Sequence, residues 1–211
     1  MTKLPQLSWK HAFGPYICET RAPYLTALEI GFEDDNDEPI FPSNVLEAAP
    51  ALERIAFESR GETMFDSTVL QAVKYALRHG SLQNLVEFDM EKCDLGNGAV
   101  RDFTNALKDS ECAKWLKMLS IECCDIVEED ARALADLLCQ DALPALEDLC
   151  VQGNSHITDV GVVALFAECL LKSMQNSLIR LYLSEVAMGD QGIVFSHISR
   201  TLGGDVGFKC S

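Results

Sequence analysis

The sequence predicts an α/β fold made of repeated strand-and-helix units. A leucine recurs about every thirty residues, and the intervals between successive copies are 27, 33, 31, 30 and 32 residues. Strand-like and helix-like patterns alternate within each interval, so the period predicts the architecture before any single residue is considered. The six leucines are Leu25, Leu52, Leu85, Leu116, Leu146 and Leu178.

Each leucine opens an L-x-x-L-x-L pattern, which is weaker in the first two blocks than in the last four. Its last two apolar positions alternate with polar residues, as is typical of a strand with one buried face. A residue three places later is expected to turn the chain and to satisfy backbone groups there. Cys93, Cys124 and Asn154 suit this task, whereas Val186 does not. The two inward-facing residues of each predicted strand are Leu28/Ile30, Ile55/Phe57, Phe88/Met90, Leu119/Ile121, Leu149/Val151 and Leu181/Leu183.

Helical runs follow the strands after connections rich in chain breakers, such as residues 157–161. Ala131, Leu134, Ala135 and Leu138 lie three and four residues apart, which indicates one buried helix face. A strand and a helix of this size cannot bury their apolar faces alone. Neighbouring units must therefore stack, and we expect a curved solenoid with strands on one surface and helices on the other. The next block repeats the helical spacing at Val162, Leu165, Phe166, Cys169 and Leu170.

With these blocks the chain resembles the leucine-rich repeat family, in particular the long-repeat ribonuclease-inhibitor type and its cysteine-containing relatives. The resemblance covers residues 80–202 well and 20–80 poorly. It implies a horseshoe with parallel strands on the concave face and helices on the convex face. About six repeats would span residues 25–202, with a cap or degenerate first repeat in residues 1–24 and a tail or cap in residues 203–211. The pattern departs from the family at Val186, which replaces Asn or Cys, and at Thr158, where a Gly is often found.

Composition excludes several classes of partner. Thirty-three acidic residues against seventeen Lys and Arg leave a net charge of −16, which argues against nucleic acid binding. No apolar stretch is long enough to cross a bilayer and no signal peptide is visible, so a cytoplasmic or nuclear location is expected. Nine cysteines are an odd number, so they cannot all pair within one chain. Cys93, Cys124, Cys139 and Cys169 fall at repeat positions and are interpreted as small buried hydrophobes.

The predicted concave surface is acidic. We expect it to bind a protein with a basic or mixed-charge surface, because opposite charges steer association. The alternative is that these acids are ordinary solvated strand residues of an acidic protein. Strand positions facing away from the helices include Glu29, Glu53 and Glu58, four cations (Arg54, Lys92, Lys117 and Arg180), and Phe32 and Ile179 as further apolar anchors. The predicted binding residues are Glu87, Asp89, Glu91, Met118, Glu122, Glu147, Asp148, Arg180, Tyr182 and Glu185.

No catalytic, metal or cofactor motif emerges, and no small-molecule substrate is evident. There is no C-x-x-C for zinc, and the acidic run at residues 33–38 lacks the glycine and the distal glutamate of an EF-hand. The sequence therefore predicts a protein-interaction scaffold and not an enzyme. The resemblance leaves open a GTPase-activating protein of the Ran-directed type or a substrate-recognition fragment of a ubiquitin-ligase adaptor, since the fold serves all of these. A structural fragment that self-associates is a further alternative.

Overall fold

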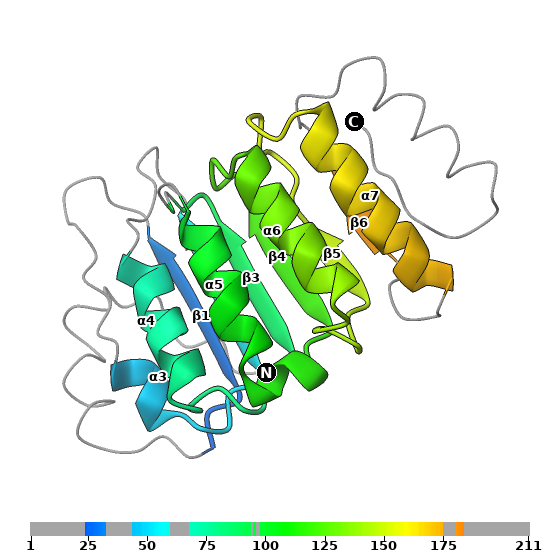
Figure 1. Ribbon diagram of the computed structural model, residues 1–211. Coiled ribbons are helices and arrows are strands. Elements are labelled where there is room, and N and C mark those ends of the chain that lie inside the picture. The colour runs from blue at the N-terminus through cyan, green and yellow to red at the C-terminus, as the bar shows by residue number, and fades with distance from the viewer. Residues whose placement is uncertain are drawn as a thin grey trace.

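Six parallel strands form one sheet in which the spatial order follows the chain order, β1-β2-β3-β4-β5-β6 (Figure 1). The computed structural model describes residues 24–32, 44–59, 68–93, 95, 98–174 and 180–183. Within these ranges each strand pairs in parallel with the next one along the chain. The predicted fold class, α/β with parallel strands, is confirmed at this level.

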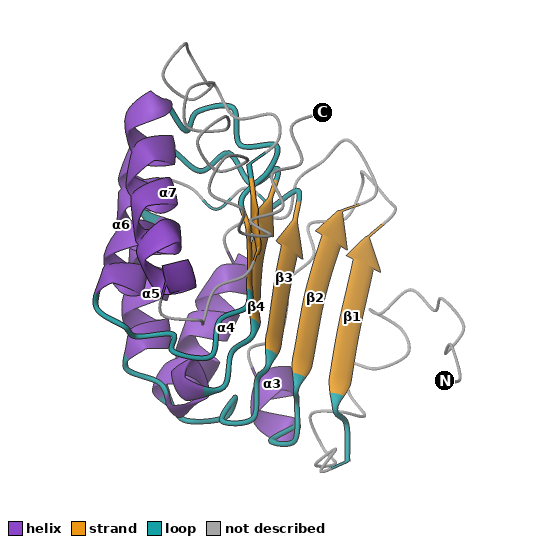
Figure 2. Cartoon of the chain, turned by 90° about the vertical axis from the view of Figure 1, so that its right-hand side faces the viewer, coloured by secondary structure: helices purple, strands orange, loops and turns teal. Residues whose placement is uncertain are grey.

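The strands are short, and helices lie between most of them. The strands are β1 (Ala27–Phe32), β2 (Arg54–Ser59), β3 (Glu87–Glu91), β4 (Met118–Glu122), β5 (Asp148–Cys150) and β6 (Arg180–Tyr182). The helices are α3 (Asn44–Ala48), α4 (Thr68–Arg78), α5 (Ala99–Lys108), the 3-10 helix η1 (Glu111–Lys114), α6 (Glu128–Cys139) and α7 (Asp159–Met174). Figure 2 shows the helices gathered on one side of the sheet.

The pairing register reproduces the leucine intervals of the sequence. Ala27 pairs with Arg54, Arg54 with Glu87, and Glu87 with Met118. Met118 pairs in turn with Asp148, and Asp148 with Arg180. Each of these residues lies two places after one of the six leucines, so the sequence intervals are also the register steps of the sheet.

The core lies between the sheet and the helices. The second, third and fourth leucines are fully buried, as are the alternating strand residues that follow them, such as Phe88, Leu119 and Leu149. Phe88 stacks on Phe103 of α5 with ring centroids 5.1 Å apart, which ties β3 to the helix layer. On α6 the predicted apolar face, Ala131, Leu134, Ala135 and Leu138, is buried. The predicted strand and helix faces are confirmed here.

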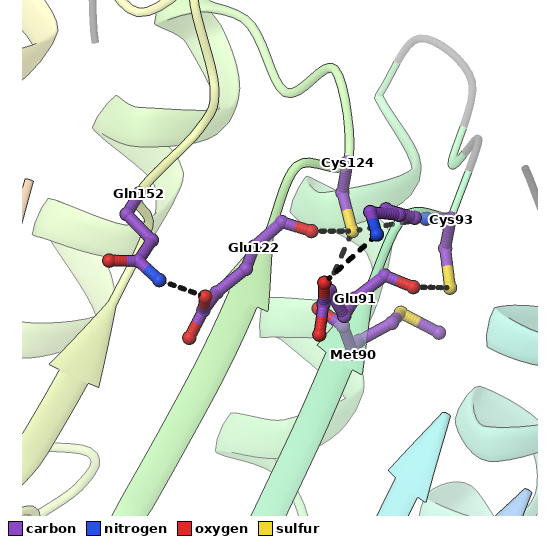
Figure 3. A network of polar contacts seen from close by, with 7 residues as sticks. Met90, Glu91, Cys93, Glu122, Cys124 and Gln152 are labelled. Carbon is purple, nitrogen blue, oxygen red and sulfur yellow. Dashed lines mark hydrogen bonds and ion pairs between the residues drawn. The ribbon is translucent and has the colours of Figure 1, made fainter. Parts of the chain in front are cut away.

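The turns after three strands are joined by side chain to backbone hydrogen bonds. Oδ1 of Asn154 accepts the backbone N–H of Cys124 at 2.9 Å, and Nδ2 donates to the carbonyl of Ile121 at 2.8 Å. One strand earlier, Sγ of Cys124 accepts the backbone N–H of Cys93 at 3.4 Å and lies 3.5 Å from the carbonyl oxygen of Met90 (Figure 3). Asn154 and Cys124 therefore bond to backbone groups, as predicted for residues at the turn, and the backbone groups belong to the preceding unit.

Gly153 in the last of these turns has φ +71°. A Cβ built there would lie 2.3 Å from Sγ of Cys123, and Cys123 itself has φ +52°. The close approach of two adjacent turns thus requires glycine at this position, both for its backbone conformation and for space. Cys124 is buried beside a partly exposed Cys123, as expected for adjacent residues that face opposite ways.

Two expectations need correction. Cys139, interpreted as buried, lies on α6 but is exposed, because it is at the last residue of the helix and beyond the buried stripe. Leu28 and Ile30 of β1 are half-buried, whereas their equivalents in the next four strands are buried. β1 is the first strand in the order, and the described helix that follows it, α3, has only five residues to cover it.

Several predictions fall outside the described residues. They are nearly all of the N-terminal cap (residues 1–24), the C-terminal segment 203–211, the acidic run at residues 33–38, Leu178, Ile179, Glu185 and Val186. Among the helices that are described, the longest is the sixteen-residue α7, and none offers an apolar stretch that would reach across a bilayer.

Candidate functional site

The predicted binding residues that belong to the described strands lie on the outward face of the sheet, which we define as the side opposite the described helices (Figure 2). Register pairing arranges this face in three rows that cross the strands. The first row is Ala27, Arg54, Glu87, Met118, Asp148 and Arg180. The middle row is Glu29, Ala56, Asp89, Ser120, Cys150 and Tyr182. The third row, at the carboxyl ends of the strands, contains Gly31 and three glutamates, Glu58, Glu91 and Glu122, which we call the glutamate row.

Around the first row the acids contact cations of the same protein. Nε of Arg54 lies 3.4 Å from Oε2 of Glu87, and its Nη2 lies 3.8 Å from Oε1 of Glu29. Across β5 and β6, Nη2 of Arg180 donates to Oδ2 of Asp148 at 2.5 Å. We call these residues, with the pair described next, the paired band.

Glu147 precedes β5 and also belongs to the paired band. Nζ of Lys117 donates to its Oε1 at 2.8 Å, and this hydrogen bond raises the pKa of the Lys117 ammonium. Hydrogen bonding to Asp148 likewise raises the pKa of the Arg180 guanidinium. Lys117 and Arg180 are therefore charged at neutral pH. The paired band thus contains three cations, with Arg54 as the third, and four carboxylates: Glu29, Glu87, Glu147 and Asp148.

In the glutamate row, Glu91 and Glu122 make polar contacts with neighbouring side chains. Nε2 of Gln152 donates to Oε2 of Glu122 (Figure 3). Oγ of Ser120 donates to Oε1 of the same carboxylate at 3.1 Å. These neutral donors orient the carboxylate but leave its charge in place. Nζ of Lys92 lies 3.4 Å from Oε1 of Glu91.

Asp89 lies in the middle row, between the first row and the glutamate row. It is half-buried, and burial raises the pKa of its carboxyl above the ordinary value, against a hydrogen bond from Ser120 that lowers it. The nearby charges of Glu122 and Glu91 raise the pKa further, whereas Arg54 lowers it. The carboxylates of Asp89, Glu91 and Glu122 thus lie close enough together for their charges to interact.

The structure places the predicted site residues in different parts of the outward face. Glu87, Glu147, Asp148 and Arg180 belong to the paired band, Glu91 and Glu122 lie at the carboxyl ends of β3 and β4, and Asp89 lies in the middle row. The predicted anchors Met118 and Tyr182 are half-buried and lie on the outward face at β4 and β6. Sequence reasoning placed all of these acids in one strip and did not find the internal pairing.

Three polar residues of this face were missed. Ser120 is fully buried, Cys150 is 6% exposed, and Gln152 bonds Glu122. For Ser120 and Cys150 the sequence signal was position, because both residues share the register of Asp89 and alternate with inward apolar residues. Burial raises the pKa of the Cys150 thiol, and the adjacent Glu122 raises it further, so the thiol stays protonated at neutral pH. The same holds for Cys93, whose pKa is raised by its contact with Cys124 and by burial.

A second feature lies on the helix side, along α4. A hollow of about 390 Å³ is lined by Thr68, Gln71, Ala72, Lys74, Tyr75, Arg78 and His79. All of these residues come from α4 and the turn that follows it. Lys74 is buried and its Nζ lies 3.7 Å from Oδ2 of Asp102 on α5, which leaves less of its charge for a ligand. None of the predicted site residues lies here.

Metal binding finds no support in the part of the chain that the structure describes. There, no three His, Cys, Asp or Glu side chains converge as ligands of a metal ion. His156 in the turn before α7 is exposed. Comparison with known proteins adds no assignment, because no protein-family model and no curated protein matches the chain.

Proposed function

We propose that this chain is a leucine-rich repeat protein whose strand surface binds another protein. The proposal for the fold includes a curved solenoid of about six repeats with the strands on its concave side. It is supported by the equality between leucine intervals and register steps, and by the equivalent bonds of Asn154 and Cys124 to the preceding turn. In a repeat architecture the units stack on one another, and here a side chain in the turn of one unit forms hydrogen bonds with backbone groups of the preceding unit.

The observation that carries the binding function is the charged outward face. A sheet side that no described helix covers presents Asp89, Glu91 and Glu122 together with the half-buried Met118 and Tyr182. Charged groups around apolar anchors are typical of protein interfaces, in which the charges set partner choice and association rate. The partner is a protein with a basic or mixed-charge surface, and the chain acts as a scaffold and not as an enzyme.

The test is affinity capture from a eukaryotic lysate with the native chain and with a triple variant, Glu87→Lys, Asp89→Lys and Glu122→Lys. The captured partner is identified by mass spectrometry, purified and titrated against both chains. We expect the native chain to bind and the variant to lose at least about tenfold in affinity, because the reversals invert steering at the face.

A matched control carries the same change in net charge on the helix side, as Glu47→Lys, Asp109→Lys and Asp136→Lys. These three residues are exposed. Circular dichroism and the unfolding midpoint of all three proteins show whether the fold is retained. Equal binding by the native chain and the strand-face variant would place the partner on the loops, the helices or an end, and would refute the proposal.

A further inference from the structure

The helix side of the molecule contains a hollow with a basic lining. It has a volume of about 390 Å³ and follows α4, which lies in the helix layer away from the outward face (Figure 2). Its described lining includes Lys74, Arg78 and His79 and contains no acid, although the whole chain has thirty-three acidic residues against seventeen Lys and Arg. Ligand pockets run from about 300 to 1,000 Å³, so this hollow suits a small ligand with one ring and one charged group.

Lys74 is the residue that points to a ligand. Its side chain is 4% exposed, and its Nζ lies 3.7 Å from Oδ2 of Asp102. That distance allows electrostatic attraction but is too long for a hydrogen bond, and Nζ has no hydrogen-bond acceptor among the described residues. A buried ammonium without hydrogen bonds costs free energy. Because Lys74 lines the hollow, an acceptor that enters the hollow from outside would remove this cost.

Arg78 places a second cation one turn further along α4. Positions i and i+4 of a helix lie about 5–6 Å apart at Cβ, and like charges at this spacing repel each other. Arg78 is exposed and forms no ion pair with a described residue. An anion between Lys74 and Arg78 would contact both side chains and remove the repulsion. A phosphate fits better than a carboxylate, because the guanidinium can bind two oxygens while the ammonium binds a third.

Tyr75 and His79 supply a flat surface beside the two cations. Their rings stack with centroids 3.9 Å apart and 23° between the planes. Nδ1 of His79 donates to the carbonyl oxygen of Tyr75 at 2.8 Å, which holds the imidazole in place and leaves Nε2 as the nitrogen available to a ligand. Tyr75 is 45% exposed. A planar ring in the hollow can therefore stack against this pair.

We propose that the hollow along α4 binds an aromatic phosphate, with the phosphate group at Lys74 and Arg78 and the ring against Tyr75 and His79. The site lies on the helix side, whereas the proposed protein-binding surface is the outward face of the sheet. The inference therefore does not depend on the proposed function, and each can fail without the other.

The test is a titration of the full ¹⁵N-labelled chain, followed by NMR, with phenyl phosphate, inorganic phosphate and phenol. Phenyl phosphate should cause saturable shifts in the backbone amides of residues 68–79, with a dissociation constant of about 1 mM or tighter. Inorganic phosphate should bind about fivefold more weakly, because it lacks the ring. Phenol should cause no saturable shifts there, because it lacks the charge.

A short peptide that contains phosphotyrosine identifies the source of the group. It presents the same phosphorylated ring on a protein chain. Tighter binding than that of phenyl phosphate would support the inference and assign the ligand to a protein side chain. Binding that is no tighter would support it and assign the ligand to a free small molecule.

Three variants locate the site. Lys74→Met keeps most of the buried volume and removes the ammonium, so it should weaken binding of both phosphates about tenfold. Tyr75→Ala should weaken phenyl phosphate about fivefold and inorganic phosphate less than about twofold. Arg78→Gln, at an exposed position, should weaken both phosphates about threefold.

The matched control is Arg132→Gln, because it removes one exposed arginine from α6, outside the hollow. It should leave binding unchanged. Circular dichroism and the unfolding midpoint of each variant check the fold, and Arg78→Gln tests the site if Lys74→Met does not fold. Equal binding by Arg78→Gln and Arg132→Gln, or phosphate-induced shifts that do not gather in residues 68–79, would overturn the inference.

Discussion

The two faces of the same sheet obey different rules. On the inward face, the register partners from β2 to β6 are all apolar and buried: Ile55, Phe88, Leu119, Leu149 and Leu181. On the outward face, one residue along, the partners are Ala56, Asp89, Ser120, Cys150 and Tyr182, which share neither size nor charge. Packing against the helices constrains the inward residues of these five strands in the same way, whereas the outward residues are not selected by that packing. That difference is why the binding proposal concerns the outward face.

The largest effect should come from shortening an inward residue. Leu119→Ala removes a side chain that is 1% exposed and leaves a cavity between the sheet and its helices, so we expect a loss of about 3 kcal/mol in the free energy of unfolding. Met118→Ala, on the adjacent outward position, is the matched control and should cost less than about 1 kcal/mol. Urea titration measures both. Similar losses in the two variants would mean that the faces are not distinct in packing.

A smaller loss is expected at the turn that joins neighbouring strands. Asn154→Ala removes the acceptor of two backbone N–H groups, from Cys124 and Ile126, and the donor to Ile121 and Val151. Because buried backbone groups then lack partners, we expect a cost of about 2.5 kcal/mol.

Cys124→Ala is the comparison for that variant, because Cys124 holds the equivalent place one strand earlier. Sulfur is a weak acceptor, and Sγ of Cys124 takes the single N–H of Cys93, so the cost should be about 1 kcal/mol. Chemical denaturation of the two variants ranks them. A greater loss for Cys124→Ala would contradict the hydrogen-bond explanation and favour packing.

The smallest effect has the opposite sign. Burial raises the pKa of Asp89 in the folded protein, so its ionised form is less favourable there than in the unfolded chain. Asp89→Asn should therefore raise stability at neutral pH, by about 0.5 kcal/mol or less. The gain should shrink as the pH falls through the raised pKa and should vanish below the ordinary value of 3.8, where both states are protonated.

Thermal unfolding of Asp89→Asn and the native chain between pH 3 and pH 7 checks this sign. Glu87→Gln is its control on the paired band, where Arg54 already compensates the carboxylate. A destabilising Asp89→Asn at neutral pH would mean that the hydrogen bond with Ser120 outweighs the cost of burial.

The register of the sheet could be predicted because it depends on a local and repeated requirement. Each strand must bury alternate residues, so the leucine intervals alone reproduced the pairing from Ala27 to Arg180. The role of Asn154 was also readable, since an amide side chain at a turn has few other partners than free backbone groups. The exposure of Cys139 was not readable, because it depends on where the buried stripe of α6 ends.

By itself, the sequence determined the class of fold, the positions of the strands and which side of each strand is buried, because hydrophobic periodicity acts within a few residues. Only the tertiary structure decided which of the outward charges compensate one another. Arg54 meets Glu87, and Arg180 meets Asp148, across gaps of more than thirty residues. Such contacts depend on side-chain directions across neighbouring strands, and these are set by stacking rather than by any local pattern.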